Sequence, residues 1–239
     1  MKKIVIIGGT SGMGRNIALR FVEAGNIVGV TGRREELLTE IKCINPDKIF
    51  TRMFDVTNSD SDKQLLSLIN EMGGMDICVY CAGYGERNSE LDTAIELKGV
   101  EVNVVAFTKM VVTAYHFFKE KGNGHIVTFS SIAATRGLGL APSYSATKSC
   151  QTVYLEALQQ KVNGERLKIN FTTIQPGFVK TDFINYKYPM TMDVDYASKR
   201  IYRAIVKRKR KAIIDWRWQI VVWIWKLIPR GLWVRIRLK

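Results

Sequence analysis

Short apolar segments alternate with helical segments along almost the whole chain, and this alternation is the strongest constraint on its fold. Apolar or β-branched runs of strand length occur at 4–7, 26–31, 48–54, 75–82, 126–129, 168–174 and 212–214. Helical periodicity separates them, in a segment that ends at Gly25 and then at 34–44, 60–72, 94–121, 144–163 and 195–207. This order is typical of parallel strands joined by helices. The expected fold class is therefore α/β, with a single doubly wound parallel sheet and helices on both of its faces.

The first strand leads directly into a glycine-rich turn. Ile4–Ile7 is an unbroken apolar run, as in a strand covered on both faces, and Gly-Gly-Thr-Ser-Gly-Met-Gly follows at 8–14, before a helical pattern. Glycines let the backbone approach a pyrophosphate, and a helix N-terminus supplies N–H groups with partial positive charge. We expect a dinucleotide site here; the alternative is a simple tight turn.

The end of the second strand indicates which dinucleotide. In such a unit an acidic residue binds the 2′-hydroxyl of the adenosine ribose in NAD, whereas an arginine accommodates the 2′-phosphate of NADP. Gly32 is followed by Arg33 and Arg34, and the first acidic residue is Glu35. The sequence therefore predicts NADP (NADPH) in preference to NAD. Arg34 has a second interpretation, as a solvated charge only.

Residues 125–150 carry the groups of a proton-transfer site. Ser131 follows a strand-like run, and a predicted helix carries Tyr144 and, four residues later, Lys148 on the same face. An unperturbed tyrosine, with a pKa of about 10, is a poor general base at neutral pH. A neighbouring lysine cation is expected to lower that pKa, and Ser131 could hydrogen-bond a substrate oxygen. The alternative is an ordinary helix start.

These motifs together resemble the classical short-chain dehydrogenase/reductase family. The similarity covers about residues 3–215 and includes, in order, GGTSGMG at 8–14, Asp55, CAG at 81–83, Asn103, Ser131, YSATK at 144–148 and PGFVKTD at 176–182. It implies a Rossmann fold and an NADPH-dependent carbonyl reductase or dehydrogenase, which transfers a hydride between nicotinamide and a ketone or alcohol.

The resemblance also implies residue roles. Tyr144 would be the acid/base, and Lys148 would lower its pKa and bind the nicotinamide ribose. Ser131 would polarise the carbonyl, and Asn103 would support a water that relays protons to Lys148. The cofactor contacts that it implies are Gly8, Thr10, Ser11, Gly12, Met13, Gly14, Arg33, Asp55, Val56, Ala82, Gly83, Tyr144, Lys148, Pro176, Gly177, Val179 and Thr181.

Two departures from the family pattern stand out. Tyr80-Cys81 occupies the place of the usual Asn-Asn, which puts local stabilisation of the sheet in doubt more than the chemistry. Only about thirteen residues separate Thr181 from the helix expected near Asp195. So short a lid indicates an open cleft and a long substrate, such as a 3-oxoacyl or long-chain keto compound.

The cysteines and histidines indicate neither a disulfide framework nor a metal site. Cys78 and Cys81 are three residues apart on a predicted strand, so they should face opposite sides of the sheet and not share a metal. We interpret the four cysteines as free thiols, mainly of the core, in a reducing cytoplasm. His116 and His125 have no ligand spacing.

The C-terminal part of the chain differs in composition from the rest. Residues 199–239 hold 14 of the 36 Lys and Arg residues and only one of the 22 Asp and Glu residues. We therefore expect a catalytic domain at 1–215 and a basic, aromatic extension at 216–239. Its apolar core, 220–225, is too short to span a bilayer, for which about twenty residues are needed.

Aromatic and basic residues together favour an interfacial element on an anionic membrane. The alternatives are packing on the protein's own cleft or on a second subunit, and an acidic partner such as acyl carrier protein. A nucleic acid is not expected, because the cations are interleaved with apolar residues and no groove-reading module is apparent.

The sequence leaves a second class of function open, a non-catalytic NADP-binding regulatory or interaction protein. The presence of Asn103, Ser131, Tyr144 and Lys148 together favours the enzyme. An epimerase or dehydratase of the longer related family is disfavoured, because the chain has no room for a substrate domain. The resemblance also implies a homodimer or homotetramer.

Overall fold

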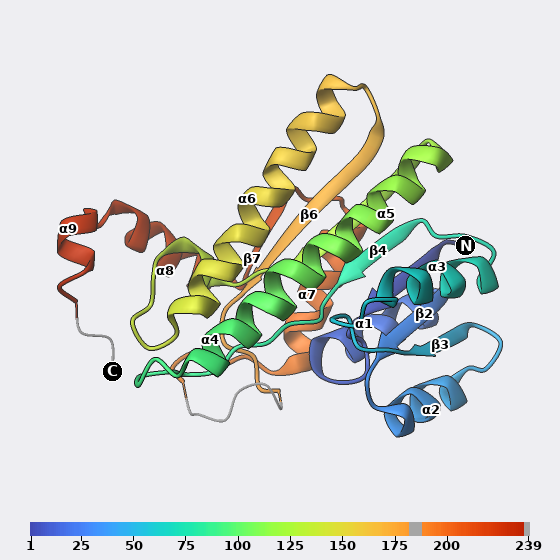
Figure 1. Cartoon of the computed structure of the whole chain (residues 1–239), viewed down its shortest axis with the longest axis horizontal. Coiled ribbons are helices and arrows are strands. Elements are labelled where there is room, and N and C mark those ends of the chain that lie inside the picture. Colours follow the sequence, from blue (N-terminus) through green and yellow to red (C-terminus); the bar gives the residue numbers. More distant parts are fainter. Residues whose placement is uncertain (182–187, 237–239) are drawn as a thin grey trace.

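The computed structural model describes residues 1–181 and 188–236, and within them seven parallel strands form one sheet (Figure 1). The strand order is β3-β2-β1-β4-β5-β6-β7. The strands are β1 (Lys3–Ile7), β2 (Ile27–Gly32), β3 (Ile49–Met53), β4 (Ile77–Tyr80), β5 (Asn123–Phe129), β6 (Lys168–Pro176) and β7 (Lys211–Ile214). The order reverses between β1 and β4, which is the switch point where α/β sheets bind ligands. The predicted α/β fold is confirmed.

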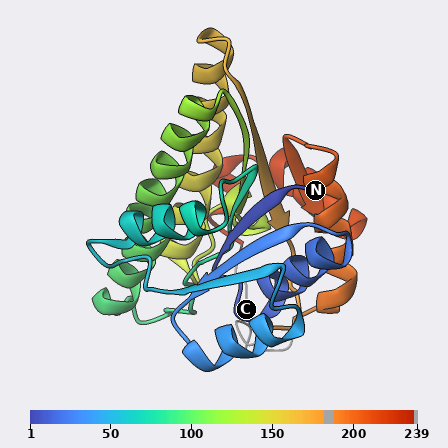
Figure 2. The same cartoon turned by 90° about the vertical axis from the view of Figure 1, so that its right-hand side faces the viewer.

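Helices cover both faces of the sheet. The helices are α1 (Gly12–Glu23), α2 (Glu35–Ile44), α3 (Ser61–Glu71), α4 (Thr93–Val100), α5 (Phe107–Lys121), α6 (Pro142–Gly164), α7 (Val194–Val206), α8 (Trp216–Leu227) and α9 (Arg230–Trp233). Buried residues of α1, α2, α7 and α8 join one core cluster, and those of α3, α5 and α6 join the other. Figure 2 shows α5 and α6 on one side of the sheet and α7 on the other.

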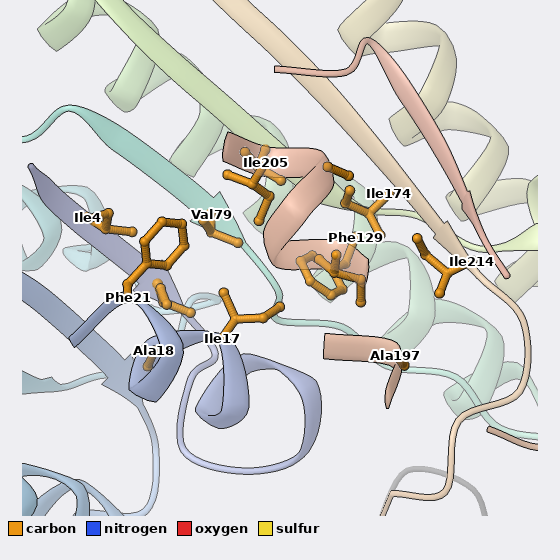
Figure 3. Packing of buried hydrophobic residues seen from close by; sticks show 14 of the residues in the cluster. Ile4, Ile17, Ala18, Phe21, Val79, Phe129, Ile174, Ala197, Ile205 and Ile214 are labelled. Atoms are coloured by element: carbon orange, nitrogen blue, oxygen red, sulfur yellow. The ribbon is translucent and has the colours of Figure 1, made fainter. Parts of the chain in front are cut away.

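Each strand contributes alternate side chains to the two cores. On β1, Ile4 and Ile6 belong to the core beneath α1 and α7, whereas Val5 and Ile7 belong to the core beneath α3 and α5. Figure 3 shows the first of these cores, where Ile17 and Phe21 of α1 meet the sheet. Burial on both faces explains why the strands read as continuous apolar runs and not as alternating patterns.

The helix expected over 94–121 contains a π-helical turn at Glu101–Ala106, between α4 and α5. Its wider hydrogen-bond spacing is characteristic of functional positions within helices. Asn103 lies in this turn and is fully buried. Helical periodicity alone gives no sign of such a turn, because the pattern of apolar residues continues through it.

The Tyr80-Cys81 departure does not interrupt the sheet. Tyr80 pairs with Ile7 on one side and Thr128 on the other, and its hydroxyl donates a hydrogen bond of 2.8 Å to the carbonyl of Val102 in the π-helical turn. A tyrosine therefore joins the end of β4 to the turn that holds Asn103.

The expectation for the cysteine pair is confirmed. Cys78 packs in the core beneath α5, whereas Cys81 packs against the core on the opposite face. Both thiols are free. Cys43 and Cys150 are also free but lie on exposed positions of α2 and α6, so the interpretation as core thiols is wrong for these two.

The C-terminal helices α8 and α9 follow β7 and pack on the body of the protein, beside the loop that leads into α6 (Figure 1). Trp218 and Val222 of α8 are buried in the core that also contains α7. Within 1–181 and 188–236, no helix combines the length and the apolar character needed to cross a membrane.

Candidate active site

One cleft of about 840 Å³ runs along the carboxyl ends of the strands. The expected cofactor residues all lie in its wall: Gly8, Thr10, Ser11, Gly12, Met13, Gly14, Arg33, Asp55, Val56, Ala82, Gly83, Tyr144, Lys148, Pro176, Gly177, Val179 and Thr181. Ser131 lines it too, whereas Asn103 does not. Their chemical roles stay predictions, but these residues, which are spread along the sequence, line one continuous cleft.

The glycine turn after β1 is built for a close approach of another group to the backbone. Gly8 has φ +84°, and a methyl group there would lie 2.6 Å from the backbone nitrogen of Ala82. A methyl group on Gly14 would lie 2.5 Å from the Gly8 carbonyl oxygen. The Ser11 side chain, at the N-cap of α1, makes no capping hydrogen bond. The first N–H groups of α1 therefore remain available to a phosphate, and the turn fits a dinucleotide pyrophosphate.

Two arginines lie where the adenosine ribose is expected. Arg33 forms an ion pair of 3.4 Å with Asp55. Burial raises the pKa of Asp55, but hydrogen bonds from Thr57 and the charge of Arg33 more than offset it, so the net shift is downward. Arg34 donates to the Ser11 hydroxyl at 2.8 Å and lines the cleft. The interpretation of Arg34 as a solvated charge only is wrong; it adds a second cation to this end of the site.

Ser131, Tyr144 and Lys148 meet at the end of β5. Ser131 lies two residues after the last residue of this strand, and its hydroxyl accepts a hydrogen bond from the Ala133 N–H at 3.1 Å. Tyr144 stands in the first turn of α6 and shares a hydrogen bond with Ser131. The Lys148 ammonium lies 5.8 Å from the centre of the Tyr144 ring. The structure thus brings together the three side chains that the sequence places up to seventeen residues apart.

The pKa of Tyr144 shifts in the direction opposite to the expectation. Burial raises it, and the hydrogen bond with Ser131 lowers it only in part. The Lys148 ammonium donates to the Phe129 carbonyl at 2.7 Å and to the Gln151 side-chain oxygen at 3.2 Å. Burial also lowers the pKa of Lys148 to about 8. Burial thus favours the neutral form of both side chains.

Asn103 stabilises the site from behind the cleft wall. Its side chain accepts from the Tyr84 N–H at 2.9 Å and donates to the Tyr84 carbonyl at 2.6 Å. Its own backbone carbonyl accepts a hydrogen bond of 2.9 Å from the Gln151 side chain, which also holds Lys148. The side-chain amide of Gln151 therefore links Asn103 and Lys148, the two residues between which the family resemblance implies a bridging water. Sequence reasoning missed Gln151, although its place three residues after Lys148, on the same helix face, could have drawn attention to it.

The other end of the cleft is aromatic and apolar. Phe178, after β6, stacks on Tyr188 with ring centres 3.9 Å apart and meets Trp218 edge-on at 5.3 Å. Trp218, Val221 and Trp225 of α8 line the same cleft. One face of the C-terminal extension therefore packs on the protein's own cleft, which is one of the alternatives that the sequence leaves open.

Comparisons with known proteins agree with this architecture. A family profile described as short chain dehydrogenase matches residues 2–191. An uncharacterized oxidoreductase of Mycobacterium tuberculosis is 28% identical over 98% of this chain and 93% of its own length.

Solved structures with lower sequence identity share the fold. The crystal structure of a short-chain dehydrogenase from Streptomyces avermitilis has a TM-score of 0.82 at 22% identity, covering 92% of this chain and 91% of its own. A serine dehydrogenase complexed with NADP+ has a TM-score of 0.81 at 23% identity, covering 89% and 94%. Since the profile spans most of the residues and the cleft carries the expected groups, the chain belongs to the short-chain dehydrogenase family of oxidoreductases, which act on alcohol and carbonyl groups.

Proposed function

We propose that the protein is an NADPH-dependent reductase of apolar, lipid-like ketones or aldehydes. The observation that carries this proposal is the pairing of the Tyr144 hydroxyl with Ser131 in a cleft whose one end is built for a dinucleotide and whose other end is aromatic. A 3-oxoacyl or long-chain keto compound fits that aromatic end, because its chain would be removed from water there.

The protein's own groups supply the proton and the stabilisation of charge. A bound nicotinamide would supply the hydride to the carbonyl carbon. Tyr144 donates its proton to the carbonyl oxygen as negative charge develops there, and its raised pKa keeps that proton in place at neutral pH. The Ser131 hydroxyl hydrogen-bonds the same oxygen, and the Lys148 ammonium adds positive charge beside the phenol.

Turnover of carbonyl compounds tests the reaction. NADPH oxidation is measured against short-chain and long-chain ketones, and Tyr144→Phe should lower kcat by about 10²–10⁴-fold, the usual contribution of a general acid. Retained NADPH binding by the variant, followed by cofactor fluorescence, is the control for folding. NADPH binding without oxidation on any carbonyl would instead support the non-catalytic NADP-binding protein.

The preference for NADPH rests on Arg33 and Arg34. Both line the cleft at the end of β2, and Asp55 is held by Arg33 and Thr57, so that its carboxylate is partnered. Arg33→Ser and Arg34→Ser should each raise KM for NADPH at least tenfold and leave KM for NADH nearly unchanged. Lys42→Ser, which removes an exposed charge from α2, is the control. An equal loss for both cofactors would contradict the preference.

We also propose that the C-terminal extension 216–239 contacts an anionic membrane. The face of α8 that points away from the cleft is apolar and exposed, and consists of Trp216, Ile220, Trp223, Ile224 and Leu227. Exposed cations lie near it in sequence: Lys207, Arg208, Lys209, Arg210, Lys211, Lys226, Arg230 and Arg235. An exposed apolar face flanked by cations matches the chemistry of an anionic lipid surface. A cytoplasmic location stays a prediction.

Co-sedimentation with vesicles tests this contact. The protein should bind vesicles of phosphatidylcholine with phosphatidylglycerol and not those of phosphatidylcholine alone, and Trp223→Ser with Ile224→Ser should abolish binding. Val153→Ser, at an exposed position of α6, is the matched control. If the double variant dissociates a homodimer or homotetramer and vesicle binding is absent, the face is a subunit contact and the membrane proposal fails.

A further inference from the structure

The inner face of α8 belongs to the same cleft as the catalytic side chains. Val221 and Trp225 line the cleft beside Phe178, and Trp218 is almost completely buried. A methyl group on Gly177 would lie 2.2 Å from the indole nitrogen of Trp218, so this tryptophan rests directly on the backbone at the end of β6. The C-terminal helix is therefore a wall of the site and not only an appendage.

A single arginine fastens this wall to the loop between the catalytic residues. Arg136 lies between Ser131 and Tyr144, and its guanidinium donates to the carbonyls of Trp225 at 3.0 Å, Lys226 at 3.0 Å and Ile228 at 2.7 Å. The last carbonyls of a helix have no partners within the helix and carry partial negative charge. At the end of α8 the Arg136 guanidinium supplies hydrogen-bond donors to these carbonyls and a positive charge beside them.

A second contact joins the same loop to α9. The Trp233 indole N–H donates to the Gly137 carbonyl at 2.8 Å, and the Trp233 ring packs edge-on against Trp225 at 5.3 Å. The Arg136 guanidinium lies 6.0 Å from the centre of the Trp233 ring. Loop and helices are therefore held as one unit, although 89 residues separate Arg136 from Trp225.

We propose that Val221 and Trp225 of α8 form a subsite for the apolar chain of the substrate, and that Arg136 is the positioning residue that fixes this subsite relative to Ser131 and Tyr144. This inference rests on the proposed carbonyl reductase activity. The subsite selects chain length: an aliphatic tail of the ketone lies against the inner face of α8, while its carbonyl lies at Tyr144. Each CH₂ group removed from water strengthens binding about fourfold, so long chains should be favoured.

Filling the subsite tests the first half of the proposal. The measured quantity is the ratio of kcat/KM for 2-dodecanone to kcat/KM for 2-butanone, with NADPH. Val221→Trp should lower this ratio at least tenfold. Ile220→Trp, the neighbouring position on the exposed outer face, should leave the ratio and the butanone rate unchanged. Trp225→Leu removes apolar contact surface from the same wall and should also lower the ratio. It serves as a second variant in case the larger tryptophan at position 221 prevents folding.

Removing the hydrogen bonds of Arg136 to the end of α8 tests the second half of the proposal. Arg136→Ala should raise KM for 2-dodecanone at least fivefold and lower the ratio, with the dissociation constant of NADPH unchanged. Arg136→Lys should rescue only a small part, because one ammonium lacks the forked donors that reach three carbonyls. A merely structural role would lower kcat for both ketones and the melting temperature without changing the ratio.

The outcomes separate the two proposals. If the wild type reduces both ketones but Val221→Trp and Trp225→Leu leave the ratio as it is, the subsite is disproved and the reductase stands. If the wild type fails to oxidise NADPH in the presence of every carbonyl compound tested, the proposed function itself fails. An unchanged ratio in Arg136→Ala overturns the positioning role alone.

Discussion

Gln151 is one of the two hydrogen-bond acceptors of the buried Lys148 ammonium. It is fully buried, its amide donates to the Asn103 carbonyl, and its oxygen accepts from the lysine ammonium. The Phe129 carbonyl is the other acceptor of that ammonium. Two neutral oxygens do not compensate for burial, which is why the pKa of Lys148 falls to about 8.

A charge at position 151 should therefore change the pH dependence of catalysis. In Gln151→Glu the carboxylate favours the ammonium and raises the pKa of Lys148 by about 1–3 units. If catalysis needs the ammonium, the fall of kcat/KM on the alkaline side, near pH 8 in the wild type, moves to higher pH. Gln151→Leu removes an acceptor and should move it to lower pH. Identical pH profiles for all three proteins would show that Lys148 is not the group that titrates.

The junction between β4 and the π-helical turn depends on Tyr80. Its hydroxyl donates to Val102 within that turn, and its ring packs edge-on against Phe107 with centres 5.3 Å apart. The turn in turn places Asn103 against Tyr84. The Tyr80 side chain thus connects the strand end to the π-helical turn, and the Asn103 side chain connects this turn to the cleft loop.

Removing that hydroxyl should cost stability. Tyr80→Phe keeps the ring but leaves the Val102 carbonyl without its donor, and should lower the free energy of unfolding by about 1–3 kcal/mol. Urea unfolding gives the value. Tyr154→Phe is the matched control, because its ring also packs on Phe107, at 5.8 Å, and its hydroxyl has no hydrogen bond to any described residue. Equal losses in the two variants would mean that the hydroxyl of Tyr80 adds nothing.

The elements themselves could be predicted from the sequence, because each depends on a local pattern. The run Ile4–Ile7, the glycines that follow it and the Tyr144–Lys148 spacing are all read within a few residues, and the structure places them in one fold and one cleft. The contacts of Arg136 with the end of α8 could not be predicted, since no local pattern joins residues so distant in the chain. The pKa direction of Tyr144 depends on burial, which only the assembled fold determines.

The position of α8 connects the catalytic domain with the basic extension. The inner face of the helix is part of the cleft, and its outer face is apolar and exposed. One helix therefore separates the site from whatever surface the extension contacts. A lipid-like substrate would need to travel only past this helix, which is why the substrate class and the membrane contact support one another while each has its own test.

Global stability should depend on pH through His125, which is buried on β5 between β4 and β6. Its side chain on β5 is 2% exposed and pairs with the Thr172 hydroxyl on β6 at 2.8 Å. Burial lowers its pKa to about 4 in the folded protein, from about 6.5 in an unfolded chain. Between these values the unfolded chain binds more protons, so the stability that neutral His125 permits is lost as the pH falls from 6.5 towards 4. The loss should be about 3 kcal/mol, since each pKa unit corresponds to about 1.4 kcal/mol.

The variant His125→Gln tests this coupling, because glutamine offers an amide to Thr172 without titrating. Unfolding free energies measured in urea at pH 7 and pH 4.5 should therefore differ less in the variant than in the wild type. Carboxylates such as Asp76, whose pKa is lowered, affect both proteins equally and cancel in the comparison. The same pH dependence in both proteins would show that His125 does not couple protonation to folding.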